Sequence, residues 1–207
     1  SGVEEIVEIA DKYWNDGIKH IVALRGDKTI GGKKSKHKLK YATDLIKLLK
    51  NCNNFDITVS AYPECHPDSK NMEQEFDILK KKIDLGATKA ITQFFFNTEK
   101  YIEFVDKAIK KNIKIPIIPG ILPITNFRRT LSFSKATNCS IPQWLKRMFK
   151  GLDSDPKTRE LIAASVAAEQ CQKILNEGIN EFHFYTLNRA DLSFAICHIL
   201  ETRFKKL

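Results

Sequence analysis

Short apolar runs alternate with helix-like stretches along the 207-residue sequence, and this alternation constrains the fold more than any other feature. The runs are too short for helices, each is followed by sequence with helical spacing, and no hairpin signal joins two of them. Strands are therefore predicted over residues 20–27, 56–64, 89–97, 113–123 and 181–188. Continuous apolar runs are typical of strands buried on both faces, so we expect a parallel sheet in an α/β fold.

The segments between the runs carry helix boundary signals. Gly17 and Gly86 end two of the predicted helices, and Pro142 and Pro156 open two others, as proline does in a first turn. Helices are predicted over residues 3–14, 41–50, 69–85, 98–111 and 190–204, with two or three more within 126–177. No linker or shift in composition interrupts the pattern, so we expect one domain over residues 1–207.

Composition excludes several classes of protein. The chain is 43% hydrophobic, enough for a buried core, but no apolar run approaches the roughly 18 residues of a membrane span. The acidic start, SGVEEIVEIA, lacks the basic region of a secretory signal. The five cysteines contain no C-x-x-C pair, which argues against a disulfide framework and against a metal site. Free thiols fit a reducing cytosol, so we expect a cytoplasmic protein. The cysteine spacing and the short apolar runs lead us to expect neither a metal nor a membrane partner.

The net charge of +9 has two interpretations. Of the basic residues, 27 are lysine and 7 are arginine, and abundant lysine, asparagine and isoleucine can reflect A+T-rich coding rather than a ligand. The alternative is a nucleic-acid-binding module built on KKSKHKLK, residues 33–40. That run lacks interleaved aromatic residues and any nucleic-acid-binding signature, so we expect no nucleic-acid partner.

Each predicted strand ends in polar or aromatic residues: RGD, YPECH, QFFFN, PGILP and YTLNR. Ligands bind at the carboxyl ends of strands in α/β folds, so these five segments predict one shared site. The sequence contains no G-x-G-x-x-G after a strand, no P-loop, no H-E-x-x-H and no G-x-S-x-G.

Six segments, in order, resemble the methylenetetrahydrofolate reductases: HIVALRGD, AYPECHP, ATKAITQFFFN, IIPGILPITNF, WLKRMFKGLD and FHFYTLNRA. The resemblance implies an eight-stranded β/α (TIM-type) barrel that binds FAD. It also implies reduction of methylenetetrahydrofolate to 5-methyltetrahydrofolate with NADH or NADPH. A complete barrel needs roughly 250 residues and eight strands. With five predicted strands, we expect this chain to lack the first three, together with the family's general-acid glutamate.

The resemblance also implies a flavin site. Asp27 would lie where flavin and folate meet, tune the flavin and hydrogen-bond the pterin. The implied flavin contacts are Arg25, Gly26, Asp27, Ala42, Tyr62, His66 and Lys82. Without the family, Asp27 would be read as a turn cap and His66 as a solvated loop residue. Lys82 belongs to a lysine triple, which is typical of a solvated helix face.

The implied substrate contacts lie further along the chain. Gln93 offers a donor and an acceptor that match the amide edge of a pterin. Arg189 suits the anionic tail of folate, because its guanidinium pairs with carboxylates. The full set is Gln93, Tyr101, Phe133, Tyr185 and Arg189. For Tyr101 and Phe133, aromatic residues at helical spacing, a core position is the alternative.

Two further expectations concern the protein as a whole. We expect the protein to form a homo-oligomer. The alternative to an active reductase is a non-catalytic remnant whose open sheet exposes a hydrophobic edge, which favours aggregation.

Overall fold

The computed structural model of the protein describes residues 2–26 and 39–200. Within them the helices are α1 (Val3–Asn15), α2 (Ala42–Cys52), α3 (Met72–Asp84), α4 (Thr98–Lys110), α5 (Phe127–Thr137), α6 (Gln143–Met148), α7 (Pro156–Asn176) and α8 (Ala190–Ile199). The strands are β1 (His20–Ala23), β2 (Asp56–Ala61), β3 (Ala87–Thr92), β4 (Ile117–Ile118), β5 (Gly120–Ile121) and β6 (His183–Phe184).

The five predicted strand segments are confirmed, and one of them forms two strands. β4 and β5 come from the same predicted run and are separated only by Pro119. Several predicted helix boundaries are confirmed, whereas the last helix, predicted over residues 190–204, ends at Ile199, and the helix predicted from residue 69 begins at Met72. Gly17 and Gly86 adopt left-handed backbone conformations after α1 and α3, with φ of 85° and 108°, which glycine reaches without steric cost. Pro156 stands at the start of α7.

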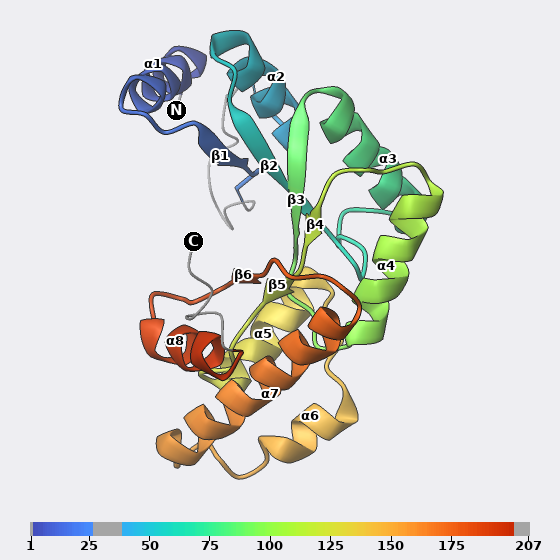
Figure 1. The fold of residues 1–207 in the computed structure, drawn as a ribbon, viewed down its shortest axis with the longest axis vertical. Coiled ribbons are helices and arrows are strands. Elements are labelled where there is room, and N and C mark those ends of the chain that lie inside the picture. The colour runs from blue at the N-terminus through green and yellow to red at the C-terminus, as the bar shows by residue number, and fades with distance from the viewer. Residues whose placement is uncertain (1, 27–38, 201–207) are drawn as a thin grey trace.

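All strand pairs are parallel, as predicted. β1, β2, β3 and β4 form one sheet in that order, and β5 pairs with β6 in a second. Each strand segment thus pairs with the next one along the chain. Figure 1 shows β1 to β4 side by side, with β5 and β6 following where the chain turns beyond Pro119. This topology is an α/β fold.

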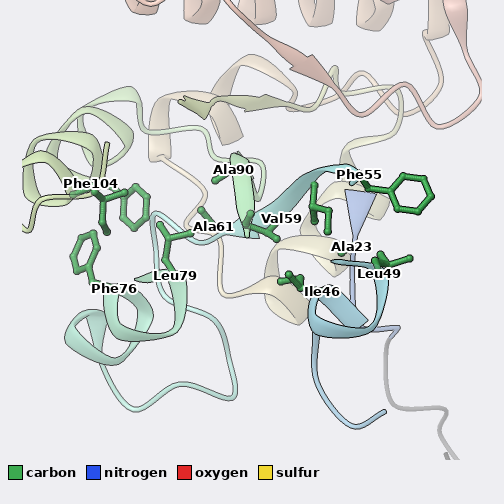
Figure 2. Close-up of a cluster of buried hydrophobic side chains, with 14 of the residues drawn as sticks. Ala23, Ile46, Leu49, Phe55, Val59, Ala61, Phe76, Leu79, Ala90 and Phe104 are labelled. Carbon is green, nitrogen blue, oxygen red and sulfur yellow. The ribbon is translucent and has the colours of Figure 1, made fainter. Parts of the chain in front are cut away.

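The first core lies between this sheet and its helices. Along β2, buried and partly exposed residues alternate: Ile57, Val59 and Ala61 are buried, whereas Thr58 and Ser60 are not. Figure 2 shows Ile46 and Leu49 of α2, and Phe76 and Leu79 of α3, packed toward Val59, Ala61 and Ala90. Burial on both faces was therefore a wrong prediction for β2, because helices of the described chain cover only one of its faces.

Two further hydrophobic cores lie around the end of β3 and around β5. One joins Phe94 and Phe96, just after β3, to Leu145 of α6 and Ala163 of α7. The other joins Phe95 and Tyr101 to Ile121 of β5 and Ile174 of α7. The three phenylalanines after β3 therefore anchor the end of that strand in both cores. The residue that precedes them, Gln93, is positioned by this packing.

Asparagine and aspartate side chains start the helices that follow the strand ends. Asn71, Asn97 and Asn126 accept hydrogen bonds from backbone amides in the first turns of α3, α4 and α5, and Asp155 does so for α7. Such N-caps satisfy amides that have no partner within the helix. They fix where each of these helices begins.

Candidate functional site

The carboxyl ends of β2, β3 and β6 meet through hydrogen bonds. The backbone amide of Gln93 donates to the Ala61 carbonyl oxygen at 2.8 Å, and the hydroxyl of Tyr185 donates to the Thr92 carbonyl oxygen at 2.9 Å. Tyr62 and Gln93 line the same small pocket. The structure therefore brings together Tyr62, Gln93 and Tyr185, as the strand-end pattern predicted.

The loop after β2 is joined to the end of β1. Arg25 pairs with Asp68 at 2.8 Å, and the Asp68 amide donates to Nδ1 of His66 at 3.0 Å. Because Nδ1 accepts this bond, the proton of a neutral His66 is on Nε2, which can donate to a ligand. The His66 ring meets Tyr62 edge-on, with centroids 4.6 Å apart. Arg25, Tyr62 and His66 therefore belong to one connected group.

Lys82 differs from the lysine beside it. Lys81 is exposed, whereas Lys82 is 6% exposed, so Lys82 is not part of a solvated helix face. Its ammonium donates to the Ser60 carbonyl at 2.8 Å and to the Ser60 hydroxyl at 3.3 Å. Burial lowers the pKa of Lys82 to about 8, and the nearby charge of Glu75 opposes that shift.

Glu75 links Lys82 to the loop after β2. Glu75 is itself 6% exposed, and its carboxylate accepts a hydrogen bond from the His66 amide at 3.1 Å. Two buried, oppositely charged groups thus flank this part of the loop. A cation held in so dry a position interacts strongly with an anion that comes into contact with it.

Gln93 has one half of its carboxamide engaged. Its side-chain oxygen accepts a 3.0 Å hydrogen bond from the Phe94 amide. Within residues 2–26 and 39–200, no group accepts a hydrogen bond from its side-chain nitrogen. That nitrogen can therefore donate to a polar ligand in the pocket that Gln93 lines.

The ring of Tyr185 packs against Gly120. A Cβ atom added at Gly120 would lie 2.7 Å from the Tyr185 ring and 2.2 Å from the Thr92 carbonyl oxygen, so only glycine fits there. Burial raises the pKa of Tyr185 to about 12, and the neighbouring Tyr62 adds to the shift. The phenol therefore stays protonated and acts as a donor at neutral pH.

Three other predicted site residues are Phe133, Arg189 and Ala42. Phe133 of α5 is half-buried, with the Arg129 guanidinium 5.7 Å from its ring centre. Arg189 precedes α8 and makes a 3.4 Å contact with Glu160, with over half of its side chain exposed. Ala42 is the first residue of α2 and is half-buried.

The structure does not bring Tyr101 to this group. Its side chain is fully buried, its hydroxyl donates to the Ile117 carbonyl at 2.7 Å, and its ring stacks on Phe95 with centroids 4.9 Å apart. Burial raises the pKa of this phenol well above its ordinary value. These contacts give Tyr101 a core position, the alternative noted for it from sequence, and contact with folate stays a prediction.

Two predicted site residues remain, Asp27 and Gly26. Asp27 lies outside the described residues, as does most of the basic run KKSKHKLK. Gly26 is exposed, and no atom of the described residues lies within 4 Å of where its side chain would begin.

Sequence reasoning missed two residues that tie the site together. Glu64 lies inside the AYPECHP segment, between Tyr62 and His66, and its side chain is only 7% exposed. Asn138 ends α5 in a left-handed conformation, with φ of 58°, and donates to the backbone of the Glu64 loop. The position of Glu64 next to a proline within AYPECHP could have drawn attention to it. Its partners, Lys100 and Ser140, are distant in sequence and could not be predicted from the segment.

Several site types are absent from the part of the chain that the structure describes. No helix there is long and apolar enough to cross a bilayer. No group of three or more histidine, cysteine, aspartate or glutamate side chains there could hold a metal ion. All five cysteines are free thiols.

Sequence comparison identifies the family that shares these segments. The methylenetetrahydrofolate reductase family matches over residues 1–201. The 5,10-methylenetetrahydrofolate reductase of Pectobacterium carotovorum is 50% identical over 97% of this chain, which covers 66% of that protein. The reductase of Escherichia coli is 49% identical over 97% of the chain, covering 67% of that protein. That of Buchnera aphidicola from Acyrthosiphon pisum is 52% identical over 95% of the chain. The chain thus spans about two thirds of the length of these relatives.

Structural comparison agrees at the level of the fold. A Clostridium thermocellum protein, described as uncharacterised and as binding two copies of 5-methyl-5,6,7,8-tetrahydrofolic acid, aligns with a TM-score of 0.59. The alignment covers 100% of this chain and 70% of that one, at 19% sequence identity. The arrangement of parallel strands and helices is therefore shared with a known α/β structure.

Proposed function

The chain belongs to the methylenetetrahydrofolate reductase family, and on that premise we propose that the protein containing it reduces 5,10-methylenetetrahydrofolate to 5-methyltetrahydrofolate, with NADH or NADPH as reductant. One observation carries the proposal. Gln93, whose side-chain nitrogen has no acceptor among the described residues, lies beside Tyr62 and Tyr185 where three strand ends converge. The tetrahydrofolate bound by the Clostridium thermocellum neighbour supports folate as the substrate class.

We propose that residues 1–207 are one domain and form part of an eight-stranded β/α barrel. Each strand segment pairs in parallel with the next along the chain, which is the strand order of a barrel. At the outer edge of this series, Val22 and Leu24 are half-exposed. Additional strands pairing at that edge would cover these side chains and close the barrel.

The residues of the site fit an FAD cofactor. A flavin diphosphate needs buried or well-oriented cations and donors, and Lys82, His66 and Arg25 supply them around the loop after β2. Tyr62 offers an aromatic surface for a planar ring system. We assign Arg25, Gly26, Ala42, Tyr62, His66 and Lys82 to this site, and Asp27 to the border between flavin and folate. When bound, FAD supplies hydride transfer between the reduced nicotinamide and the folate.

The substrate side is assigned to residues of later elements. Gln93 donates to the pterin from its side-chain nitrogen, and the protonated phenol of Tyr185 borders the same space. Phe133 provides a half-buried aromatic face for a stacked ring. Arg189 is exposed enough to meet the carboxylates of the folate tail. Tyr101 supports this group from the core by packing on Phe95.

Two properties of the whole protein complete the proposal. Five free thiols support a reducing compartment, the cytoplasm. We propose that the protein acts as a homo-oligomer, which sedimentation of the purified full-length chain tests directly.

The functional test is rapid kinetics on the full-length protein, measuring flavin reduction and reoxidation separately. The purified protein should be yellow, lose its flavin absorbance with NADH or NADPH, and regain it with methylenetetrahydrofolate. Gln93→Ala should weaken folate binding about 5- to 150-fold, because a buried polar edge loses its partner. It should change flavin reduction much less.

Gln172→Ala serves as the matched control, because within the described part of the chain the Gln172 side chain bonds only to the exposed Asn176 on the same helix. It should leave both half-reactions unchanged. Equal losses in both half-reactions for Gln93→Ala would mean that the substitution merely disturbs packing. Failure of methylenetetrahydrofolate to reoxidise the reduced wild-type flavin would contradict the proposed activity and favour a non-catalytic remnant.

A further inference from the structure

The side chain of Glu64 makes contacts that no predicted role explains. It is only 7% exposed, yet it carries a carboxylate. One of its oxygens lies 2.7 Å from the ammonium of Lys100, near the start of α4. Both oxygens lie 3.1 Å from the backbone amide of Ser140, beyond the end of α5. The buried charge is therefore satisfied by one cation and one amide from two different elements.

The backbone around Glu64 repeats the connection to α5. The side chain of Asn138, the residue that follows α5, donates to the Glu64 carbonyl at 3.0 Å and to the Cys65 carbonyl at 3.3 Å. Asn138 and Cys65 both have positive φ, of 58° and 70°. Asparagine reaches this region readily, whereas cysteine rarely does so unless its surroundings hold it. Residues 138–140 and 64–65 thus fix each other's backbone.

These contacts join two halves of the proposed site. The loop of Glu64 carries Tyr62 and His66 on the flavin side, whereas α5 carries Phe133 on the substrate side. The contacts span more than 70 residues of sequence. Among the described residues that line the pocket beside Gln93, Glu64 and Cys65 come from this loop, and Thr137 and Cys139 come from the end of α5.

From this geometry we infer that Glu64 is a positioning residue that fixes α5, and with it Phe133, against the loop that holds Tyr62 and His66. The expected effect on catalysis rests on the proposed function. The contacts of Glu64 with Ser140 and Asn138 do not depend on that function. Loss of Glu64 should let the end of α5 move away from the loop. The distance between the flavin and the bound substrates would then vary, while the flavin contacts of the loop remain.

The first experiment needs no activity. Hydrogen exchange of the full-length holoprotein, read at the Ser140 amide, should be about 10-fold faster in Glu64→Ala, because a hydrogen bond to a charged group is lost. Glu64→Gln retains an acceptor oxygen for that amide and should restore most of the protection. Glu103→Ala is the matched control, since Glu103 is an exposed residue of α4 whose one ion pair within residues 2–26 and 39–200 is with Lys107 on its own helix.

The second experiment measures kinetics per bound flavin. Glu64→Ala should keep its FAD and raise KM for methylenetetrahydrofolate about 10-fold, with Glu64→Gln within about 3-fold of wild type. A purely structural role would lower the melting temperature and the flavin content without changing KM of the molecules that retain flavin. That result would overturn the inference, as would unchanged exchange at Ser140 or an equal rise of KM in both variants. Absence of folate reduction in the wild type would overturn the proposed function alone, because the exchange result stands without it.

Discussion

The phenol of Tyr185, in the segment after β6, donates a 2.9 Å hydrogen bond to the carbonyl oxygen of Thr92, the last residue of β3. Thr92 is fully buried, and its hydroxyl in turn accepts a 2.9 Å bond from the Gly120 amide at the start of β5. β3 pairs by its backbone with β4, and β6 pairs with β5. The side chains of Thr92 and Tyr185 therefore bridge the two ladders at the point where β4 gives way to β5.

Replacement of Tyr185 by phenylalanine should test this bridge. Tyr185→Phe keeps the ring contacts with Phe94 and His183 but removes the donor to Thr92. We expect a loss of about 1 kcal/mol in the free energy of unfolding, the usual contribution of one hydrogen bond. We also expect weaker folate binding, because Gln93 follows Thr92 directly. Urea denaturation and folate titration measure the two effects.

Tyr13→Phe provides the reference for that substitution, because Tyr13 is 44% exposed on α1. It should be neutral in both measurements. If Tyr185→Phe behaves in the same way, the bond to Thr92 has no energetic role.

Gly120 is predicted to tolerate no side chain. In Gly120→Ala the new methyl group would overlap the Thr92 carbonyl, a backbone atom that cannot move without disturbing β3. We expect destabilisation of at least about 1–3 kcal/mol, the usual cost of overpacking a core. Thermal unfolding of the variant should show it. Gly26→Ala, at a position with open space, should change stability by less than about 0.5 kcal/mol.

The fold followed closely from local sequence because its signals agree. Gly17 and Gly86 end helices in the structure as in the pattern, and Pro156 starts one. The break between β4 and β5 could not be read from the apolar run, because it depends on which neighbour each half pairs with. Pairing partners are set by tertiary contacts rather than by the pattern of the segment itself.

The site was partly predictable for the same reason. Parallel strands place their carboxyl ends on one side, which brought Tyr62, Gln93 and Tyr185 together. The burial of Lys82 depends on Ser60, 22 residues away, and a helical charge pattern contains no such information. For Tyr101 the sequence suggested a site position, because Tyr101 follows the QFFFN segment, but its hydroxyl bonds to Ile117 in the core.

Arg189 provides a test of substrate charge. Its pair with Glu160 is exposed and 3.4 Å long, so it contributes little to stability. Arg189→Ala should therefore leave unfolding unchanged within about 0.5 kcal/mol. It should weaken methylenetetrahydrofolate binding about 10-fold, because a charged hydrogen bond to the folate tail is lost. Isothermal titration at two salt concentrations measures the loss and its dependence on screening.

Arg128→Ala is the matched variant for this test. Arg128 forms a comparable exposed pair with Asp153 at 2.8 Å. A general effect of lost positive charge would lower folate affinity in both variants. Only a specific contact lowers it in Arg189→Ala alone.

Lys82 predicts a dependence of stability on pH. Its pKa falls from 10.5 to about 8 in the folded protein because its ammonium is buried. Between these two values the unfolded chain holds a proton that the folded chain has released. Stability should therefore rise with pH through this window, by up to about 3 kcal/mol for a shift of this size. The penalty of the buried charge is fully present below pH 8.

Comparison of variants isolates this contribution. Lys82→Met removes the titrating group, so wild type should gain stability relative to Lys82→Met as the pH rises from 8 to 10.5. Lys81→Met, which changes the exposed neighbour, should follow the wild-type profile. Urea denaturation of the apoprotein across this range gives the curves. Parallel curves for wild type and Lys82→Met would show that Lys82 does not titrate in this window.

A phosphate-bearing ligand favours the charged form of Lys82, so FAD affinity should fall above pH 8 in wild type and stay level in Lys82→Met.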